Sequence, residues 1–322
     1  MTTSVRLLVP LLSACLCGPA AVQGQSYPIR PIRLVVGFAP GGGTDLVARI
    51  VARKMTDGLG QSVVVDNRPG AGGIIANEIV VRAAADGYTL NVTTSSYAVS
   101  SAVHKLSYEP LKDITPICLL GSSPLLFVTP LAVPVNNVKE LIHHATALGG
   151  RLNYASTGQG GITHIGVELF KMMANVEMNH IPYKGTGPAL TDLLRGEVQF
   201  MLGTNITTVP HIRGKRLRGL AVTTLRRSPV VPELPTVDES GVPGYELSIW
   251  YGIWGPARLP QSVLSSLHAE TGRILALPDV RESLTHEGLE VASATPEEFR
   301  QIIRRDIEKF TNVARASRMK VH

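Results

Sequence analysis

The chain has 322 residues, of which 44% are hydrophobic and 17% are charged, so an intrinsically disordered chain is excluded. A length of this order predicts about two domains, each able to bury its own core. The net charge of +6 is accompanied by only 5% aromatic residues, too few for a base-stacking surface, so we expect no nucleic acid partner.

The first residues are typical of a secretion signal. Arg6 is the only charged residue before an apolar run at 7–12 and a stretch of small residues at 17–21. We therefore predict a signal peptide at residues 1–24 and a mature protein that works in the periplasm. Residues 12–15 also resemble a lipobox, which would make Cys15 a lipid anchor, and the sequence leaves both forms of export open.

Cysteine usage predicts a mature protein without an intramolecular disulfide. Cys15 and Cys17 lie in the predicted signal, which leaves Cys118 alone. Because apolar residues flank Cys118, we expect a small buried hydrophobic side chain rather than a nucleophile.

Short apolar runs alternate with helical patterns along the mature chain. This alternation predicts right-handed βαβ units on parallel sheets. The predicted strands are 32–36, 62–65, 88–92, 152–155, 178–181, 198–202, 217–222 and 246–254. The predicted helices include 46–51, 75–83, 138–148, 165–172, 188–194, 263–275 and 297–313. The Pro-rich residues 228–244 predict an irregular surface segment.

The pattern of strands and helices begins again after Pro124, which predicts two α/β lobes. We expect one lobe to contain residues 25–124 and 250–322, and the other to contain residues 125–249. The last helix has too few strands beside it to build a third domain, so we expect it to pack on the first lobe.

Three junctions between a strand and a helix are rich in Gly or in small hydroxyl residues, at 40–45, 93–96 and 156–161, and a Gly-rich loop at 70–73 opens a further helix. Open α/β sheets bind ligands outside the carboxyl ends of their strands, where such loops meet. Glycine lets the backbone approach a ligand closely, and free N–H groups at a helix start attract anions. The pattern predicts an anion site without an Arg clamp, with hydroxyl donors from Thr44, Ser95, Ser156 and Thr163.

His164 follows one of these loops, and two interpretations remain open for it. It is either a donor in a ligand pocket or a residue satisfied locally at a helix start. The basic residues between 211 and 227 have two interpretations as well, a solvated face or a surface that attracts anions or a membrane partner.

Enzymatic alternatives lack the residues that they need. The loop at 41–44 does not end in Gly-Lys-Ser/Thr, no Gly-x-Gly-x-x-Gly follows the first strand, and neither Gly-x-Ser-x-Gly nor His-Glu-x-x-His occurs. We therefore expect no enzyme, no cofactor and no metal. A hydrolase that uses Ser95 or Ser156 with His164 is the remaining rival, but no carboxylate is positioned to orient the His.

Several motifs together resemble one family. They lie at residues 35–45 (VVGFAPGGGTD), 67–73 (NRPGAGG), 153–158 (NYASTG), 181–185 (IPYKG) with 188–194 (PALTDLL), and 235–241 (PTVDESG). The chain is similar over residues 27–310 to the Bug-type substrate-binding proteins of tripartite tricarboxylate transporters.

The resemblance implies a type II periplasmic-binding-protein fold (Venus flytrap), with two lobes joined by crossover strands. It implies a monomer that captures a small carboxylate, such as a di- or tricarboxylate or a related organic acid, and passes it to membrane transporter subunits. An alternative within the family is a sensor that reports the bound state to a membrane signalling partner. The expected ligand-binding residues are Phe38, Gly42, Gly43, Thr44, Ser95, Ser96, Ser156, Gly158, Gly160, Gly161, Thr163, His164, Tyr183 and Gly203.

The chain departs from the resemblance at two positions. Many relatives carry an acidic residue where this chain has Gly203, and Gln199 often replaces an Asp. If that acid faces the cleft in relatives, its loss removes a partner for a ligand ammonium. We therefore expect a carboxylate without an amino group to bind in preference to an amino acid.

Overall fold

The computed structural model describes residues 27–286 and 288–316, so the predicted signal peptide and Cys15 lie outside the described residues. The strands are β1 (Ile32–Val36), β2 (Val63–Asn67), β3 (Thr89–Thr94), β4 (Ile114–Pro130), β5 (Asn153–Ser156), β6 (Asn179–Pro182), β7 (Phe200–Thr204), β8 (Leu217–Val222), β9 (Ser248–Pro256) and β10 (Glu290–Ala294). The helices are α1 (Gly43–Leu59), η1 (Ala71–Gly73), α2 (Ile74–Val81), α3 (Ser96–Val103), α4 (Val138–Leu148), α5 (Ile162–Ala174), α6 (Thr186–Arg195), α7 (Asn205–Arg213), α8 (Gln261–Ala276), α9 (Pro278–His286) and α10 (Pro296–Ala316).

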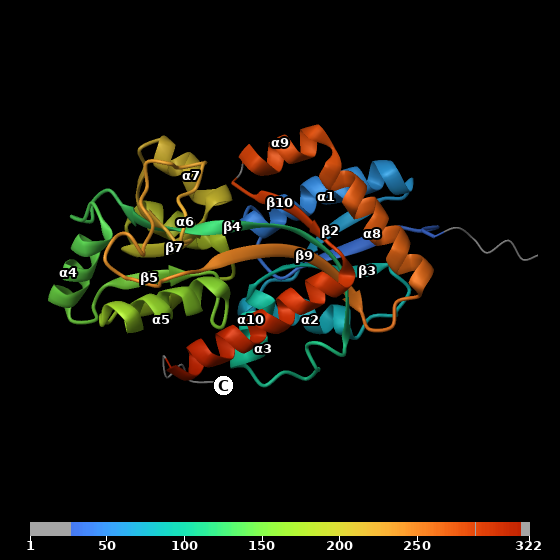
Figure 1. Ribbon diagram of the computed structural model, residues 1–322, viewed down its shortest axis with the longest axis horizontal. Coiled ribbons are helices and arrows are strands. Elements are labelled where there is room, and N and C mark those ends of the chain that lie inside the picture. Colours follow the sequence, from blue (N-terminus) through green and yellow to red (C-terminus); the bar gives the residue numbers. More distant parts are fainter. Residues whose placement is uncertain (1–26, 287, 317–322) are drawn as a thin grey trace, which may run out of the picture.

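The strands form one curled sheet in the order β2-β1-β3-β9-β4-β7-β5-β6, with β8 and β10 paired to β4 as well. The long strand β4 changes partners along its length. Its residues 114–124 pair with β9, and its residues 125–130 pair with β7 and β8. We call the group of β1, β2, β3, β9 and β10 with their helices the first lobe, and the group of β5 to β8 the second lobe. Figure 1 shows β4 and β9 running side by side between the two lobes.

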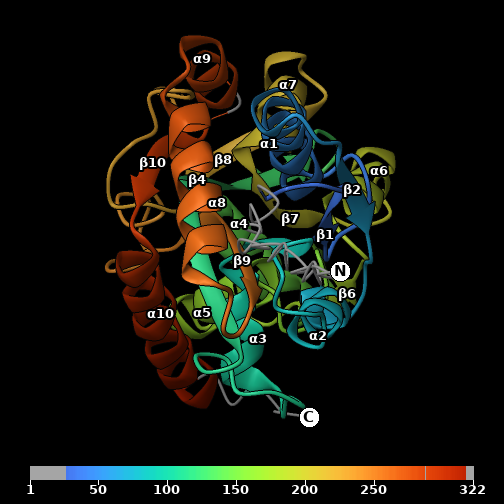
Figure 2. The same cartoon turned by 90° about the vertical axis from the view of Figure 1, so that its right-hand side faces the viewer.

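Both lobes contain the parallel units that the sequence predicts. β1 pairs in parallel with β2 and β3, and β5 pairs in parallel with β6 and β7. The helices that connect these strands cover the sheet on its outer sides (Figure 2). The predicted α/β fold with two lobes and crossover strands is therefore confirmed.

Five elements were not predicted, namely β4, η1, α7, α9 and β10. Pro116 and Pro124 lie inside β4, and Pro cannot donate to a strand ladder, so its sequence argues against a strand. The pairing with β9 shifts register next to Pro116, which accommodates the missing donor. Pro210 has the same effect on the sequence signal of α7.

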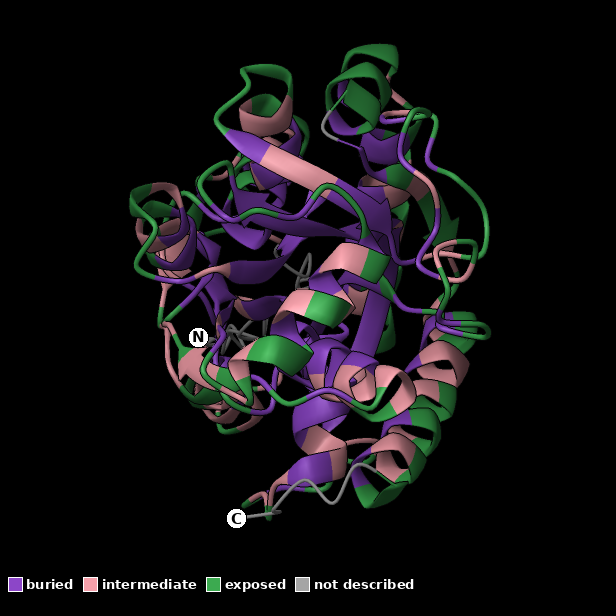
Figure 3. Ribbon diagram, turned by 90° about the vertical axis from the view of Figure 1, so that its left-hand side faces the viewer, coloured by how far each residue is buried: buried purple, intermediate pink, exposed green. Residues whose placement is uncertain are grey.

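One hydrophobic cluster extends from one lobe to the other through β4 and β9. Figure 3 shows the strands largely coloured as buried, whereas the helices around them alternate between buried and exposed residues. Phe127 on β4 is fully buried and makes edge-to-face contacts with Phe170, Phe200 and Tyr245 of the second lobe. Cys118 lies on the same strand and is buried, as expected for a small apolar side chain. The C-terminal helix α10 packs against α3 and β4. Within the described ranges, no helix combines the length and the apolar character needed to cross a bilayer.

Candidate functional site

A narrow cavity lies between the two lobes, and the empty space along it amounts to about 310 Å³, part of which is open to solvent. Its wall contains the ends of strands and the starts of helices from both lobes, with small polar side chains predominant. The lining residues are Phe38, Gly42, Gly43, Thr44, Thr94, Ser96, Thr157, Ile162, Thr163, Thr186, Thr204 and Ile249. None of these residues carries a formal charge, so the wall offers neutral hydroxyls and backbone N–H groups.

The first lobe contributes the start of α1, which is held by a buried carboxylate. Asp45 accepts hydrogen bonds from the Gly41 backbone N–H at 3.0 Å, from Arg49 Nε at 3.0 Å and from Asn67 Nδ2 at 3.0 Å. Burial works to raise the pKa of Asp45, but the hydrogen bonds from Arg49, Gly41 and Asn67 outweigh it and lower the pKa below its usual value. The ionised carboxylate therefore fixes the loop, and the first N–H groups of α1 have no partner within the helix.

The second lobe contributes the loop that follows β5. Thr163 Oγ1 accepts a hydrogen bond from the Thr157 backbone N–H at 2.9 Å and lies 3.0 Å from Thr157 Oγ1. Gly161 is the N-cap of α5 and provides no side-chain cap. The first turn of α5 consequently presents the Thr163 backbone N–H beside two hydroxyls, which is a favourable environment for an anion.

The two lobes touch directly around the cavity. The Ile162 backbone N–H donates to Ser96 Oγ at 3.1 Å, and the Ala39 backbone N–H donates to the Lys184 carbonyl at 2.9 Å. Gly158 has a φ of +138°, and a β-carbon there would lie 3.0 Å from the Gly72 backbone nitrogen. Only glycine allows this close approach of the two Gly-rich loops.

His164 does not line the cavity. Its Nδ1 accepts a hydrogen bond from the Gly160 backbone N–H at 3.2 Å, and its ring stacks on His180 with 4.0 Å between centroids. Burial lowers the pKa of His164 to about 4 and that of His180 to about 3, so both rings are neutral at neutral pH. The structure thus shows the local satisfaction that was one of the two interpretations of His164.

The serine side chains that the rival hydrolase requires are bonded to groups other than His164. Ser156 Oγ lies 2.6 Å from His180 Nε2 and is fully buried, so its partner is His180 and not His164. Ser95 Oγ accepts a hydrogen bond from the Trp250 backbone N–H at 3.2 Å, and Ser95 is also fully buried. Neither hydroxyl is bonded to His164 among the described residues. The contact between Ser95 or Ser156 and His164 that the rival hydrolase requires is therefore not found in the described part of the chain.

The expected ligand-binding residues fall into three groups in the structure. Those that line the cavity are Phe38, Gly42, Gly43, Thr44, Ser96 and Thr163. Those that build the loops or the turn next to the cavity without lining it are Ser95, Ser156, Gly158, Gly160, Gly161 and His164. Tyr183 and Gly203 lie elsewhere: the Tyr183 hydroxyl donates to Asp192 at 2.8 Å, and the side of Gly203 that a β-carbon would occupy faces Thr208.

Sequence reasoning missed half of the cavity wall. Thr94 and Thr157 lie inside junctions that were singled out, but their hydroxyls were not. Thr186 and Thr204 lie at two further junctions between a strand and a helix, and the small hydroxyl there is a signal that the sequence does carry. Ile249 is an apolar residue of a central strand, and nothing in the sequence marks it.

A two-lobed α/β fold, with strands that cross between the lobes and a polar cavity lined by helix starts, defines the class of periplasmic solute-binding proteins. The family model described as "Tripartite tricarboxylate transporter family receptor" (TctC) matches residues 47–318, and the chain belongs to this family. The resemblance of the sequence motifs to the Bug-type proteins is thereby confirmed.

Relatives and solved structures agree with this assignment. The chain is 35% identical to the protein BugT of Bordetella pertussis over 305 residues, which cover 94% of each chain. The solved structure of R. palustris Rpa4515 with adipate is 34% identical to this chain in sequence, with a TM-score of 0.87. The match covers 90% of this chain and 98% of Rpa4515. The structure of MatC from Rhodopseudomonas palustris with bound malate is 33% identical to this chain, with a TM-score of 0.85. The match covers 89% of this chain and 99% of MatC.

Proposed function

We propose that this protein captures a small carboxylated solute between its lobes and delivers it, chemically unchanged, to the membrane subunits of a tripartite tricarboxylate-type transporter. The lobes in this proposal are residues 25–124 with 250–322, and residues 125–249. The change of partners along β4 between Pro124 and Leu125 supports that division. The observation that carries the proposal is the cavity between the lobes, where the starts of α1, α3, α5 and α6 meet and several hydroxyls line the wall.

The chemistry of the wall suits a carboxylate. Each helix start stabilises an anion by roughly 0.3–1 kcal/mol, and each hydrogen bond to a charged acceptor contributes about 1.5–3 kcal/mol. Gly43 and Thr44 on one side and Thr163 on the other supply backbone donors from both lobes, whereas the Ile162 backbone N–H is already bonded to Ser96 Oγ. A ligand that binds both lobes favours their closed arrangement, because only a difference in affinity between two states shifts their populations.

The same wall supports the preference for an acid without an amino group. No carboxylate lines the cavity in the described part of the chain, so a ligand ammonium would have no charged partner. Gly203 does not line the cavity, so the absence of an acidic side chain at position 203 is not the reason for this preference. The reason is the uncharged wall.

A thermal-shift screen tests the proposal. The panel contains adipate and malate, which are bound in the two neighbouring structures, together with citrate, aspartate and glutamate. A ligand at about 100 times its dissociation constant adds ~2.7 kcal/mol of stability, which a melting curve resolves. We expect at least one carboxylate without an amino group to raise the Tm. The absence of any shift with the carboxylates, or a shift with the amino acids alone, would overturn the proposal.

Tryptophan fluorescence gives a second test. Trp250 and Trp254 lie on β9, and Trp250 follows the cavity residue Ile249 while its Nε1–H donates to Asp306 on α10 at 2.7 Å. Ligand capture should therefore change the emission. A silent signal in the presence of binding proven by calorimetry would contradict the placement of β9 at the moving junction between the lobes.

A further inference from the structure

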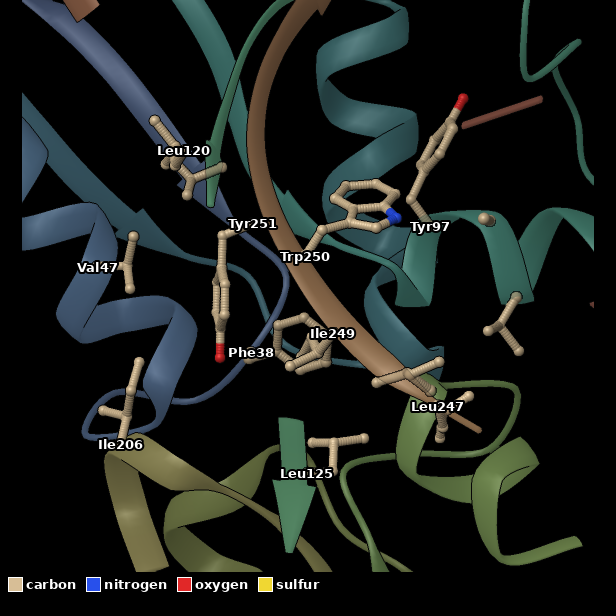
Figure 4. Close-up of a cluster of buried hydrophobic side chains, with 14 of the residues drawn as sticks. Phe38, Val47, Tyr97, Leu120, Leu125, Ile206, Leu247, Ile249, Trp250 and Tyr251 are labelled. Carbon is tan, nitrogen blue, oxygen red and sulfur yellow. The ribbon is translucent and has the colours of Figure 1, made fainter. Parts of the chain in front are cut away.

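Tyr251 has a buried hydroxyl that the structure leaves unpaired beside the cavity. The residue is 0% exposed, and its oxygen has no hydrogen-bond partner among the residues that the structure describes. Tyr251 follows Ile249 by two positions on β9, so both side chains lie on the same face of the strand, and Ile249 lines the cavity. Figure 4 shows the hydroxyl oxygen pointing away from β9, between Ile206 and Ile249.

Gly43 and Thr204, which line the cavity from opposite lobes, lie next to this hydroxyl. A β-carbon placed on Gly43 would be 3.1 Å from the Tyr251 hydroxyl oxygen and 3.2 Å from Thr204 Oγ1. Because glycine has no side chain, the space between the two hydroxyls is not filled by the first turn of α1. Tyr251 itself does not line the cavity, so its hydroxyl lies directly behind the part of the wall that Gly43 and Thr204 form, where α1 of the first lobe meets the end of β7.

A buried donor without a partner is uncommon in native proteins and calls for a reason. Tyr245 provides the comparison, since it is also fully buried but donates to the Gly166 carbonyl at 2.9 Å. Burial raises the pKa of Tyr251, so its phenol stays protonated and acts as a neutral donor at neutral pH. The hydroxyl therefore suits a hydrogen-bond acceptor that is absent from the protein itself.

We propose that Tyr251 is a specificity-determining residue whose hydroxyl donates a hydrogen bond to the bound solute. This inference rests on the proposed function and adds to it a requirement for the ligand. The donors at the cavity fall into two sets, one around Ser96, Thr157 and Thr163, and one at Gly43 and Thr204 with the Tyr251 hydroxyl directly behind them. The first set receives one carboxylate, and Tyr251 receives a second acceptor, for which a second carboxylate is the simplest chemistry.

Selectivity follows from the hydrogen bond that only an acceptor can give this hydroxyl. An acid that ends in a methyl group offers no acceptor beside Gly43 and Thr204, so the hydroxyl stays unpaired, as it is in the free protein, and binding gains nothing from it. The protein should therefore prefer a dicarboxylate over the monocarboxylate of the same length. No lining residue carries a positive charge, so hydrogen bonding and not ion pairing provides the discrimination.

The test is the variant Tyr251→Phe, which removes only the hydroxyl. Calorimetry compares adipate with hexanoate, and malate with 2-hydroxybutyrate, so that each pair differs in its second carboxylate. In the wild-type protein the dicarboxylate should bind more tightly in at least one pair. In the variant its affinity should fall by about 10-fold or more, since a hydrogen bond to a charged acceptor is lost. The affinity for the monocarboxylate should stay within about 2-fold.

A matched control separates ligand binding from stability. Tyr245→Phe removes an equally buried hydroxyl that has a partner in the second lobe, and it should lower the Tm without changing the ratio of affinities. Tyr251→Phe should leave the Tm of the free protein unchanged or higher, because it removes an unpaired polar group.

The outcomes distinguish this inference from the function on which it rests. Unchanged dicarboxylate affinity in Tyr251→Phe overturns the inference and leaves carboxylate capture standing. An equal loss for both members of a pair also overturns it, because the hydroxyl would then not read the second carboxylate. Failure of the wild-type protein to bind any of the four acids would instead overturn the proposed function.

Discussion

The two loops that face each other across the cavity are held in different ways. The loop before α1 is fixed by an ionised group, since Asp45 is bonded to Arg49, Asn67 and the Gly41 backbone N–H. The loop before α5 is fixed by neutral groups alone: Thr157 and Thr163 bond one another, and Ser156 and Gly160 bond to neutral histidines.

The difference shows how a cavity for an anion stays free of formal charge. An acid in the first turn of α1 would repel a bound carboxylate, but Arg49 pairs with Asp45 at 2.9 Å and neutralises it. The second loop has no acid to neutralise, and a charged histidine there would be deeply buried, so His164 and His180 remain neutral. The two loops should therefore respond to different perturbations.

Acid should affect the second loop before the first, and this is the largest effect that we expect. An exposed His in the unfolded chain has a pKa of about 6.5, whereas the folded values of His164 and His180 are about 4 and about 3. As the pH falls from about 6.5 to about 4, the unfolded chain takes up protons that the folded stack does not. Stability should fall by up to about 1.4 kcal/mol per pH unit for each of the two rings.

Urea denaturation at several pH values measures this slope. His180→Phe keeps an aromatic ring in the stack and should reduce the slope by the contribution of one histidine. The Asp45 network behaves differently, because its lowered pKa means that its contribution is full above the ordinary value of 3.8 and is lost only as the pH falls below it. An unchanged slope in His180→Phe would show that the stack does not control acid stability.

Asp45→Ala should disrupt the first loop. The change leaves Arg49, Asn67 and the Gly41 backbone N–H without their acceptor, and we expect a loss of about 2–3 kcal/mol in the free energy of unfolding. Ligand affinity should fall as well, because Gly43 and Thr44 are in the same turn of α1. Asp45→Asn is the control, since it keeps an oxygen for Gly41 and loses only the charge; equal losses in both variants would assign the effect to the ion pair.

Thr163→Val should produce a smaller loss in the second loop. Valine has the shape of threonine but leaves the Thr157 backbone N–H without an acceptor, which corresponds to about 1 kcal/mol. Thr191→Val on the exposed side of α6 is a control for the substitution itself. If Thr163→Val destabilised the protein more than Asp45→Ala, the contrast between a charged and a neutral loop would be incorrect.

The sequence indicated much of the fold, because its signals are local. The runs at 32–36 and 217–222 coincide with β1 and β8, and the predicted Gly-rich junctions at 40–45 and 156–161 lead into α1 and α5. Strand length, helix period and loop chemistry depend on neighbouring residues, so one sequence suffices to read them. The long strand β4 escaped this approach, since Pro116 and Pro124 are tolerated there only through its pairing with β9.

The candidate site, like the fold, has features that the sequence indicated and features that only the tertiary structure determined. The sequence by itself determined that small hydroxyl and glycine residues would gather at strand ends, and six of the expected residues line the cavity. Only the tertiary structure decided that His164 would stack on His180, that Ile249 would join the wall, and that the Tyr251 hydroxyl would remain unpaired beside Gly43. These relations join residues far apart in the chain, and their energies depend on burial and distance, which exist only once the lobes are packed.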